Sequence, residues 1–293
     1  MYVTMSSDIS YDPVSALDEN EAVGAIADIF LDIRHTMKIP LVTSIWRGLA
    51  DIDNSLETIW AMAKPIYQTE KVENKLKAII SKICLPLPSP LESDELENCG
   101  LIRQDWEQIS IILKAYNRSN GMNMVALHAM IKLNFPKITV NTKSNEKINW
   151  PTLPKLMHRE QIDDNTWDLI CDVNSLCAPN GKKSHVATLW RHLAHWPTFL
   201  RIINKKLKPL NETDTLQSLL LKTKTELSQN GLQIEFKEIF NHNLSPKAYS
   251  TVKDYVFKET QVIRMVVIGH IIQNWIESQK IYESKSGEYD VFY

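Results

Sequence analysis

Three histidines lie within eleven residues in the second half of the sequence: His185, His192 and His195. His192 and His195 are three residues apart, so on a helix they would share a face, and imidazole is a common metal ligand. A third ligand would have to come from elsewhere in the chain. Surface or hydrogen-bonded histidines are therefore the favoured interpretation, and we predict no metal site. The sequence has no P-loop, dinucleotide-binding motif or Ser-His-Asp order, and no cofactor is predicted.

Two arginines in similar surroundings could bind an anion. Arg47 follows Trp46, and Arg191 follows Trp190. A guanidinium group can hold a carboxylate through two parallel hydrogen bonds. The favoured alternative is a structural ion pair with one of four aspartates: Asp28, Asp32, Asp168 or Asp172. The two tryptophans are expected to pack in the core or where two halves of the chain meet.

The surroundings of these arginines indicate an internal repeat. Residues 42–50 and 186–194 are identical at five of nine positions and lie 144 residues apart. Residues 28–32 resemble 168–172 at a separation of 140, and the two matches keep the same order along the chain.

A weaker third match joins two histidines in apolar stretches, His128 and His270, which are 142 residues apart. We expect both to be hydrogen-bonded within the core. Chance similarity between amphipathic helices is the alternative to a repeat. The favoured interpretation is a duplicated unit of about 140 residues, packed as an intramolecular pseudo-dimer. A small-molecule site is then expected between the halves.

The composition indicates a globular, helical protein. Of 293 residues, 44% are hydrophobic and 23% charged, and the formal net charge is -2, which gives no reason to expect nucleic acid or an anionic membrane as partner. Only 8 residues are glycine, where average usage predicts roughly 20. No signal peptide, membrane span or Cys-x-x-Cys pair is recognisable, so a cytoplasmic protein with reduced thiols is expected.

The apolar spacing predicts an all-α fold. Helices are expected over residues 19–38, 41–63, 70–83, 105–116, 122–133, 163–177, 183–207, 213–229 and 246–277. Residues 117–121 look like a break, and the pair Ser245-Pro246 is a helix start signal.

We divide the chain into a first repeat (1–136), a linker (137–154), a second repeat (155–278) and a polar tail (279–293). Within the linker, residues 138–140 look like a short strand. If the duplicated faces bury each other, the plainest expectation is a monomer.

Three motifs carry a family resemblance. They are residues 32–42 (DIRHTMKIPLV), 115–120 (AYNRSN) and 187–197 (ATLWRHLAHWP). Together they resemble the group I, non-stereospecific 2-haloacid dehalogenases, an all-α family built from two duplicated halves, within the wider alkylhydroperoxidase-like superfamily. The resemblance covers about residues 28–278. It implies a hydrolase that acts on 2-halo or similar 2-substituted acids, with a small carboxylate as ligand.

In that family an aspartate between the halves activates a water that displaces the halide, with no covalent intermediate. Here Leu189 stands at that position, and leucine cannot accept a proton. Thr188 keeps the preceding hydroxyl, and its repeat counterpart is Ser44. By resemblance, the expected pocket residues are Asn120, Thr188, Leu189, Leu41, Ser44 and Lys258.

The sequence leaves three functions to be considered. An enzyme could use another base, and His185 and His192 are the nearest candidates because a neutral imidazole can accept a proton near pH 7. A non-catalytic binding or structural protein could have kept only the scaffold. The redox chemistry of the wider superfamily is disfavoured, because the sequence has no Cys-x-x-Cys pair.

Overall fold

The structure is a computed structural model that describes residues 16–133, 148–178, 181, 185–234, 244–258 and 262–279, and this part of the chain is all-helical. The α-helices are α1 (Gly24–Met37), α2 (Ser44–Ala50), α3 (Ser55–Tyr67), α4 (Glu70–Ile83), α5 (Ser93–Asn98), α6 (Arg103–Lys132), α7 (Asp164–Ser175), α8 (Thr188–His192), α9 (Pro197–Glu212), α10 (Thr215–Asn230), α11 (Pro246–Phe257) and α12 (Val262–Ser278). Two short 3-10 turns, η1 (Arg159–Gln161) and η3 (Leu193–His195), complete them. No helix in the described ranges is both long and apolar enough to cross a membrane.

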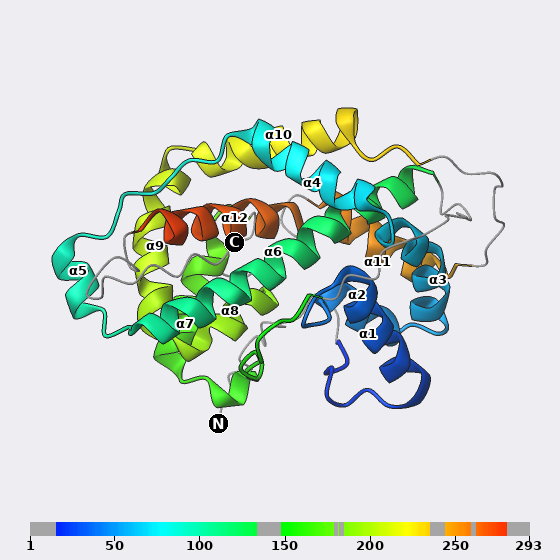
Figure 1. Ribbon diagram of the computed structural model, residues 1–293, viewed down its shortest axis with the longest axis horizontal. Coiled ribbons are helices and arrows are strands. Elements are labelled where there is room, and N and C mark those ends of the chain that lie inside the picture. Colours follow the sequence, from blue (N-terminus) through cyan, green and yellow to red (C-terminus); the bar gives the residue numbers. More distant parts are fainter. Residues whose placement is uncertain are drawn as a thin grey trace, which may run out of the picture.

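Two long helices, α6 and α12, pack against each other through the middle of the molecule (Figure 1). The expected break at residues 117–121 is wrong, because α6 runs without interruption from Arg103 to Lys132. Its polar residues have packing reasons to be there. Gly121 leaves room for the side chain of Leu76 on α4, and Asn117 donates a hydrogen bond to Gln273 on α12 at 2.6 Å.

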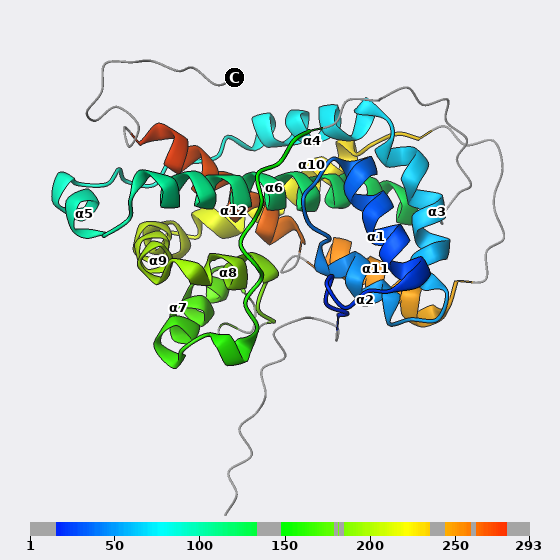
Figure 2. The ribbon, with the colours of Figure 1, turned by 60° about the horizontal axis from the view of Figure 1, so that its bottom comes forward.

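The remaining helices form two groups on either side of this pair. Helices α1, α2, α3 and α11 lie at one end of α6, and α7, α8 and α9 lie at the other (Figure 2). Helices α4 and α10 contact each other, and they pack on α6 and α12 respectively. Helix α11, late in the sequence, packs on α2 from the first half, while α8 packs on α6.

Local signals explain most helix ends. Asp163 and Ser245 are side-chain N-caps, with oxygens that accept from Thr166 and Ala248, and Pro246 occupies the first turn as expected. Three expected helices are each divided in two. Asn54, with φ of 51°, separates α2 from α3, and Pro197 begins α9 after the 3-10 turn. The third division lies between α11 and α12.

The internal repeat and the division into domains remain predictions. The contacts are consistent with a repeat, since α1 packs on α3 and the proposed equivalent helix α7 packs on α9. Residues 148–154 of the predicted linker are described and carry no helix. The expected strand at residues 138–140, and the tail beyond residue 279, lie outside the described residues.

Candidate functional site

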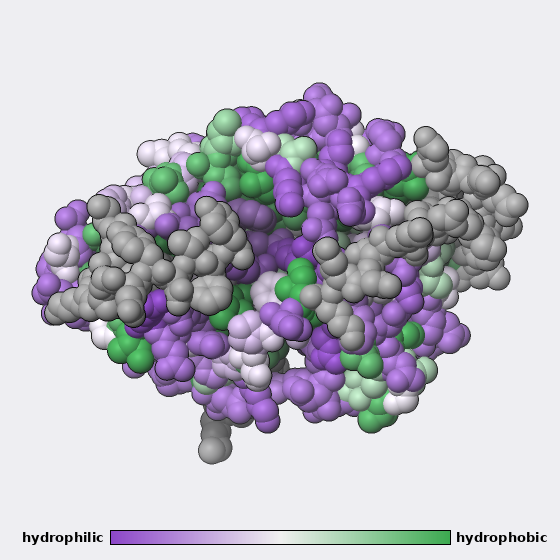
Figure 3. Space-filling view, in the orientation of Figure 1, coloured by the Kyte–Doolittle hydropathy of each residue, from purple (hydrophilic) through white to green (hydrophobic). Residues whose placement is uncertain are grey.

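A large cavity of about 1540 Å³ lies between the two groups of helices. Its walls come from α1 and the loop after it, from α3 and α4, from the extended segment 148–156, and from α8. Figure 3 shows that this face of the molecule is hollowed near its middle and that hydrophilic residues surround the hollow. Elements far apart in the sequence therefore meet around one space.

Buried residues line one part of this cavity, which we call the floor. They are Ile39, Leu41, Val42, Arg47, Tyr67, Tyr116, Thr188 and His192. Three of them, Leu41, Thr188 and His192, are site residues expected from the sequence. None of these eight residues is a carboxylate. The floor combines apolar side chains, hydroxyl groups, one imidazole and one guanidinium group.

His192 is held in one orientation by two hydrogen bonds. Its Nε2 lies 2.7 Å from the carbonyl oxygen of Pro154, which can only accept, so Nε2 carries the hydrogen. The unprotonated Nδ1 lies 3.3 Å from the hydroxyl of Tyr116, and the two rings meet edge to face. Burial lowers the pKa of His192 to about 4. The imidazole is therefore neutral at pH 7 and a weak base.

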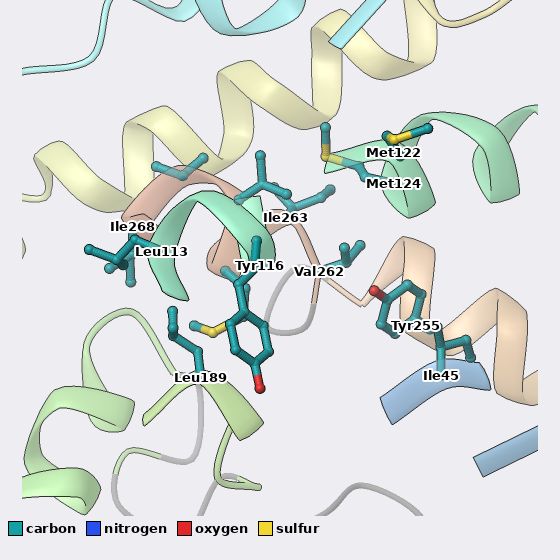
Figure 4. Packing of buried hydrophobic residues seen from close by; sticks show 14 of the residues in the cluster. Ile45, Leu113, Tyr116, Met122, Met124, Leu189, Tyr255, Val262, Ile263 and Ile268 are labelled. Atoms are coloured by element: carbon teal, nitrogen blue, oxygen red, sulfur yellow. The ribbon is translucent and has the colours of Figure 1, made fainter. Parts of the chain in front are cut away.

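Leu189 and its proposed repeat counterpart, Ile45, are packing residues. Leu189 is 1% exposed and belongs to the hydrophobic core. Figure 4 shows Leu189 on α8 beside Tyr116 of α6, and Ile45 on α2 beside Tyr255 of α11. Each aliphatic side chain thus lies next to a tyrosine from a neighbouring helix.

A buried polar network lies next to the floor and centres on Asn123. Its Oδ1 accepts from the indole of Trp46 at 3.2 Å and from the hydroxyl of Tyr67 at 2.9 Å. Its Nδ2 donates to Thr43 Oγ1 at 2.9 Å. The hydroxyl of Tyr255 lies 3.5 Å from the same nitrogen. The sequence interpretation missed Asn123, Tyr67 and Tyr255, because their partners are 56 or more residues away along the chain.

Asn120 joins this network at its edge. Its Oδ1 accepts from the Tyr255 hydroxyl at 3.3 Å, and its side chain is 8% exposed. Desolvation raises the pKa of both Tyr67 and Tyr255 above the ordinary value, so both phenols stay protonated and act as donors at neutral pH.

Lys258, the sixth expected pocket residue, does not line the cavity. It is exposed at the end of α11 and lies 2.5 Å from the carboxylate of Asp254, one turn earlier. The α11 residue that reaches the buried network is Tyr255, three positions before Lys258.

His185 and Ser44 also lie apart from the floor. His185 is exposed, and its carbonyl oxygen accepts from Asn174 Nδ2 at 2.9 Å. Ser44 is half-buried in the first turn of α2. Neither lines the cavity, whereas Thr188, the proposed repeat counterpart of Ser44, does.

The two arginines singled out from the sequence are both buried and both donate to backbone carbonyl groups. Arg191 Nε donates to Met157 at 2.9 Å, and Arg47 Nη1 donates to Leu17 at 3.4 Å. Only Arg47 lines the cavity. It places positive charge on the floor, where a carboxylate ligand would benefit from it.

Segment 148–156 forms one wall and is tied to both groups of helices. The indole of Trp150 donates to the carbonyl oxygen of Lys38 at 3.0 Å. On the other side, Pro154 and Lys155 accept from His192 and His195, the latter at 2.8 Å. The expectation that these histidines are hydrogen-bonded is confirmed, with His192 buried and His195 exposed.

Comparison with solved structures finds proteins that share the fold of this chain. The chain superposes on a D-2-haloacid dehalogenase mutant with a TM-score of 0.69 at 14% identity, covering 91% of this chain and 97% of the other. A complex of D-2-haloacid dehalogenase with L-LA gives a TM-score of 0.63, covering 93% and 94%. At such identities these likenesses show that the fold is that of this all-helical class of enzyme.

Two curated relatives agree with that class. One, from Pseudomonas sp. (strain 113), is described as a configuration-inverting 2-haloacid dehalogenase, and 231 residues match at 21% identity, covering 74% of this chain and 71% of the relative. The other, an (R)-2-haloacid dehalogenase from Pseudomonas putida, matches at 22% identity over 111 residues, which is only 37% of its length. No family model matches the sequence. The relatives and the fold together support a place in the 2-haloacid dehalogenase family.

Proposed function

We propose that this protein binds a small 2-substituted carboxylate on the floor of the cavity, in a site derived from the group I, duplicated type of 2-haloacid dehalogenase within the alkylhydroperoxidase-like superfamily. The observation that carries this proposal is the meeting of Leu41, Thr188 and His192, from motifs about 150 residues apart, on one floor with Arg47. Arg47 suits the carboxylate, and Thr188 supplies a hydroxyl group to the substituent at carbon 2.

Hydrolysis of a carbon–halogen bond lacks its usual base on this floor. A carboxylate would have to stand within hydrogen-bond reach of the attacking water. Leu189 is a core residue at that position, and the imidazole of His192 is a weak base whose Nε2 is held by Pro154. We therefore propose binding without efficient dehalogenation. His192 is the group that would support slow hydrolysis.

A non-catalytic structural role for the scaffold is the second candidate. The observation that favours it is the burial of Leu189, since an apolar side chain there stabilises the core and contributes nothing to chemistry. This candidate differs from the first in one measurable property, which is affinity for a small acid.

One experiment separates these possibilities. The purified protein is mixed with 2-chloropropionate of either hand, with monochloroacetate and with lactate, and binding and halide release are followed by ligand-observed NMR and ion chromatography. We expect binding of 2-chloropropionate and lactate, with no halide release above the uncatalysed rate. Thr188→Val removes the hydroxyl at nearly constant volume and should weaken binding several-fold, about 1 kcal/mol for one lost hydrogen bond.

Thr225→Val is the matched control, because Thr225 is exposed on α10 far from the cavity lining. Halide release at enzymatic rates, abolished by Asn120→Ala, would show that another base replaces the aspartate. No binding of any of these acids would favour the structural role.

A further inference from the structure

The cavity is much larger than the small acid proposed for its floor. A three-carbon 2-hydroxy acid has six non-hydrogen atoms, and at about 30 Å³ for each water-sized group it fills roughly 180 Å³. The cavity measures about 1540 Å³. Most of its volume therefore lies beyond the floor, along walls formed by α1, α4 and segment 148–156.

The charges on these outer walls do not cancel. Four of the five lining carboxylates each lie within ion-pair distance of a basic side chain: Asp18 with His158, Glu19 with Arg34, Asp32 with Lys64, and Glu73 with Arg118. Glu70 is the fifth and has no ion pair among the described residues.

Three lining lysines, in contrast, have no carboxylate within ion-pair distance in the described part of the chain. They are Lys38 after α1, Lys77 on α4 and Lys155 on segment 148–156, and we call them the rim lysines. The partner of Asp18 is an imidazole, which is charged only when protonated. Three lysines without an ion pair therefore stand against at most two uncompensated carboxylates, Glu70 and Asp18, and the outer cavity carries an excess of positive charge.

Two rim lysines act on the same carboxylate. Glu73 binds Arg118 at 2.5 Å, and the positive charges of Lys38 and Lys77 also act on its carboxylate, lowering its pKa. Three cations thus surround one carboxylate on the wall formed by α1 and α4. Lys155 adds positive charge from the opposite wall. Such a one-signed cluster at the mouth of a cavity raises the local concentration of anions.

We propose that the ligand carries a second anionic group, which Lys38 and Lys77 bind at the rim while its carboxylate occupies the floor. This inference rests on the proposed function and extends it from a small monocarboxylate to an extended dianion. The long, flexible side chains of lysine suit a second group whose position varies with the length of the ligand.

The test compares two acids with the same six-carbon chain, hexanoate and adipate, which differ only in the second carboxylate. Dissociation constants are measured by isothermal titration calorimetry. We expect adipate to bind about five- to tenfold more tightly, the sum of two partly exposed ionic contacts. The double variant Lys38→Gln/Lys77→Gln should reduce this ratio to below about twofold and leave the affinity for hexanoate unchanged.

Lys71→Gln is the matched control. Lys71 lies on α4, is exposed and does not line the cavity, so the same loss of charge should leave the adipate-to-hexanoate ratio intact. Circular dichroism confirms that each variant is folded. Equal affinity for the two acids in the unaltered protein would overturn this inference alone, as would a ratio that survives the double variant. Absence of binding by both acids would overturn the proposed function and this inference together.

Discussion

The short helices α2 and α8 have similar sequences but different surroundings. Around α2, the indole of Trp46 donates to Asn123. Around α8, the buried indole nitrogen of Trp190 has no hydrogen-bond partner within the described ranges. His192, in the last position of α8, lines the cavity, and Gly48 stands at the corresponding position of α2.

The two helices differ in how their polar side chains are partnered. Next to α2, Trp46 belongs to a buried network with side chains from α3, α6 and α11, and Arg47 of the same helix lines the cavity. The α8 side places two polar side chains, Thr188 and His192, on the lining of the cavity.

The largest effect is expected from breaking the α2 network at its centre. Asn123→Leu removes the acceptor of two buried donors, the Trp46 indole and the Tyr67 hydroxyl, and one of the donors to Thr43, which still accepts from Ser119. We expect the free energy of unfolding to fall by about 4 kcal/mol, measured by urea denaturation. Asn98→Leu, at an exposed position, is the control and should cost below about 1 kcal/mol. Equal costs for the two variants would contradict the network's importance.

The second-largest effect is expected in the pH dependence of stability, through His192 on α8. Burial lowers the pKa of His192 to about 4, below its value in the unfolded chain, about 6.5. Above pH 6.5 both states are neutral and stability is unaffected. As the pH falls from 6.5 to 4, the unfolded chain binds a proton that the folded chain does not, so stability decreases, by at most about 3 kcal/mol.

His192→Gln should remove this part of the acid destabilisation, as followed by the free energy of unfolding at pH 7 and pH 4.5. His185→Gln is the matched control on an exposed histidine and should change nothing. His128 and His270, also buried with lowered pKa values, remain in both variants and leave a residual slope. An unchanged slope in His192→Gln would mean that this imidazole is not held neutral.

The smallest effect is expected in the difference in stability between variants of the two equivalent tryptophans, Trp46 and Trp190. Trp46→Phe and Trp190→Phe remove similar volumes from fully buried positions. Only the first removes a hydrogen bond, so we expect Trp46→Phe to be about 1 kcal/mol more destabilising in thermal or urea denaturation. Equal costs for the two variants would show that the hydrogen bond of Trp46 does not distinguish the two helices, and a larger cost for Trp190→Phe would contradict the prediction.

The positions of the helices could be predicted from the sequence more accurately than the contacts between them. Apolar spacing located most helices, and Ser245-Pro246 marked a helix start correctly. The error at residues 117–121 arose because Asn and Gly disfavour helices locally, whereas contacts with α4 and α12 stabilise the helix there.

The candidate site could be predicted only in part, because long-range contacts bring some of its side chains together. Leu41 and Thr188, expected by resemblance, and His192, expected as an alternative base, line the cavity. The sequence did not point to Tyr255, which the fold brings to Asn120 from 135 residues away. His270 is hydrogen-bonded as expected, with Nδ1 2.7 Å from the carbonyl of Val266. For His128 the outcome differs, because neither of its buried ring nitrogens has a hydrogen-bond partner among the residues that the structure describes.

Segment 148–156 places a fluorescent side chain, Trp150, in the wall of the cavity. The indole of Trp150 lines the cavity and is tied to the carbonyl oxygen of Lys38, next to the proposed site of the second anionic group. Indole emission responds to the polarity and charge of its surroundings, and Trp46, Trp106, Trp190 and Trp275 are enclosed in the core, away from those changes. The fluorescence of this wall therefore offers a direct readout of ligand entry that needs no turnover and no added label.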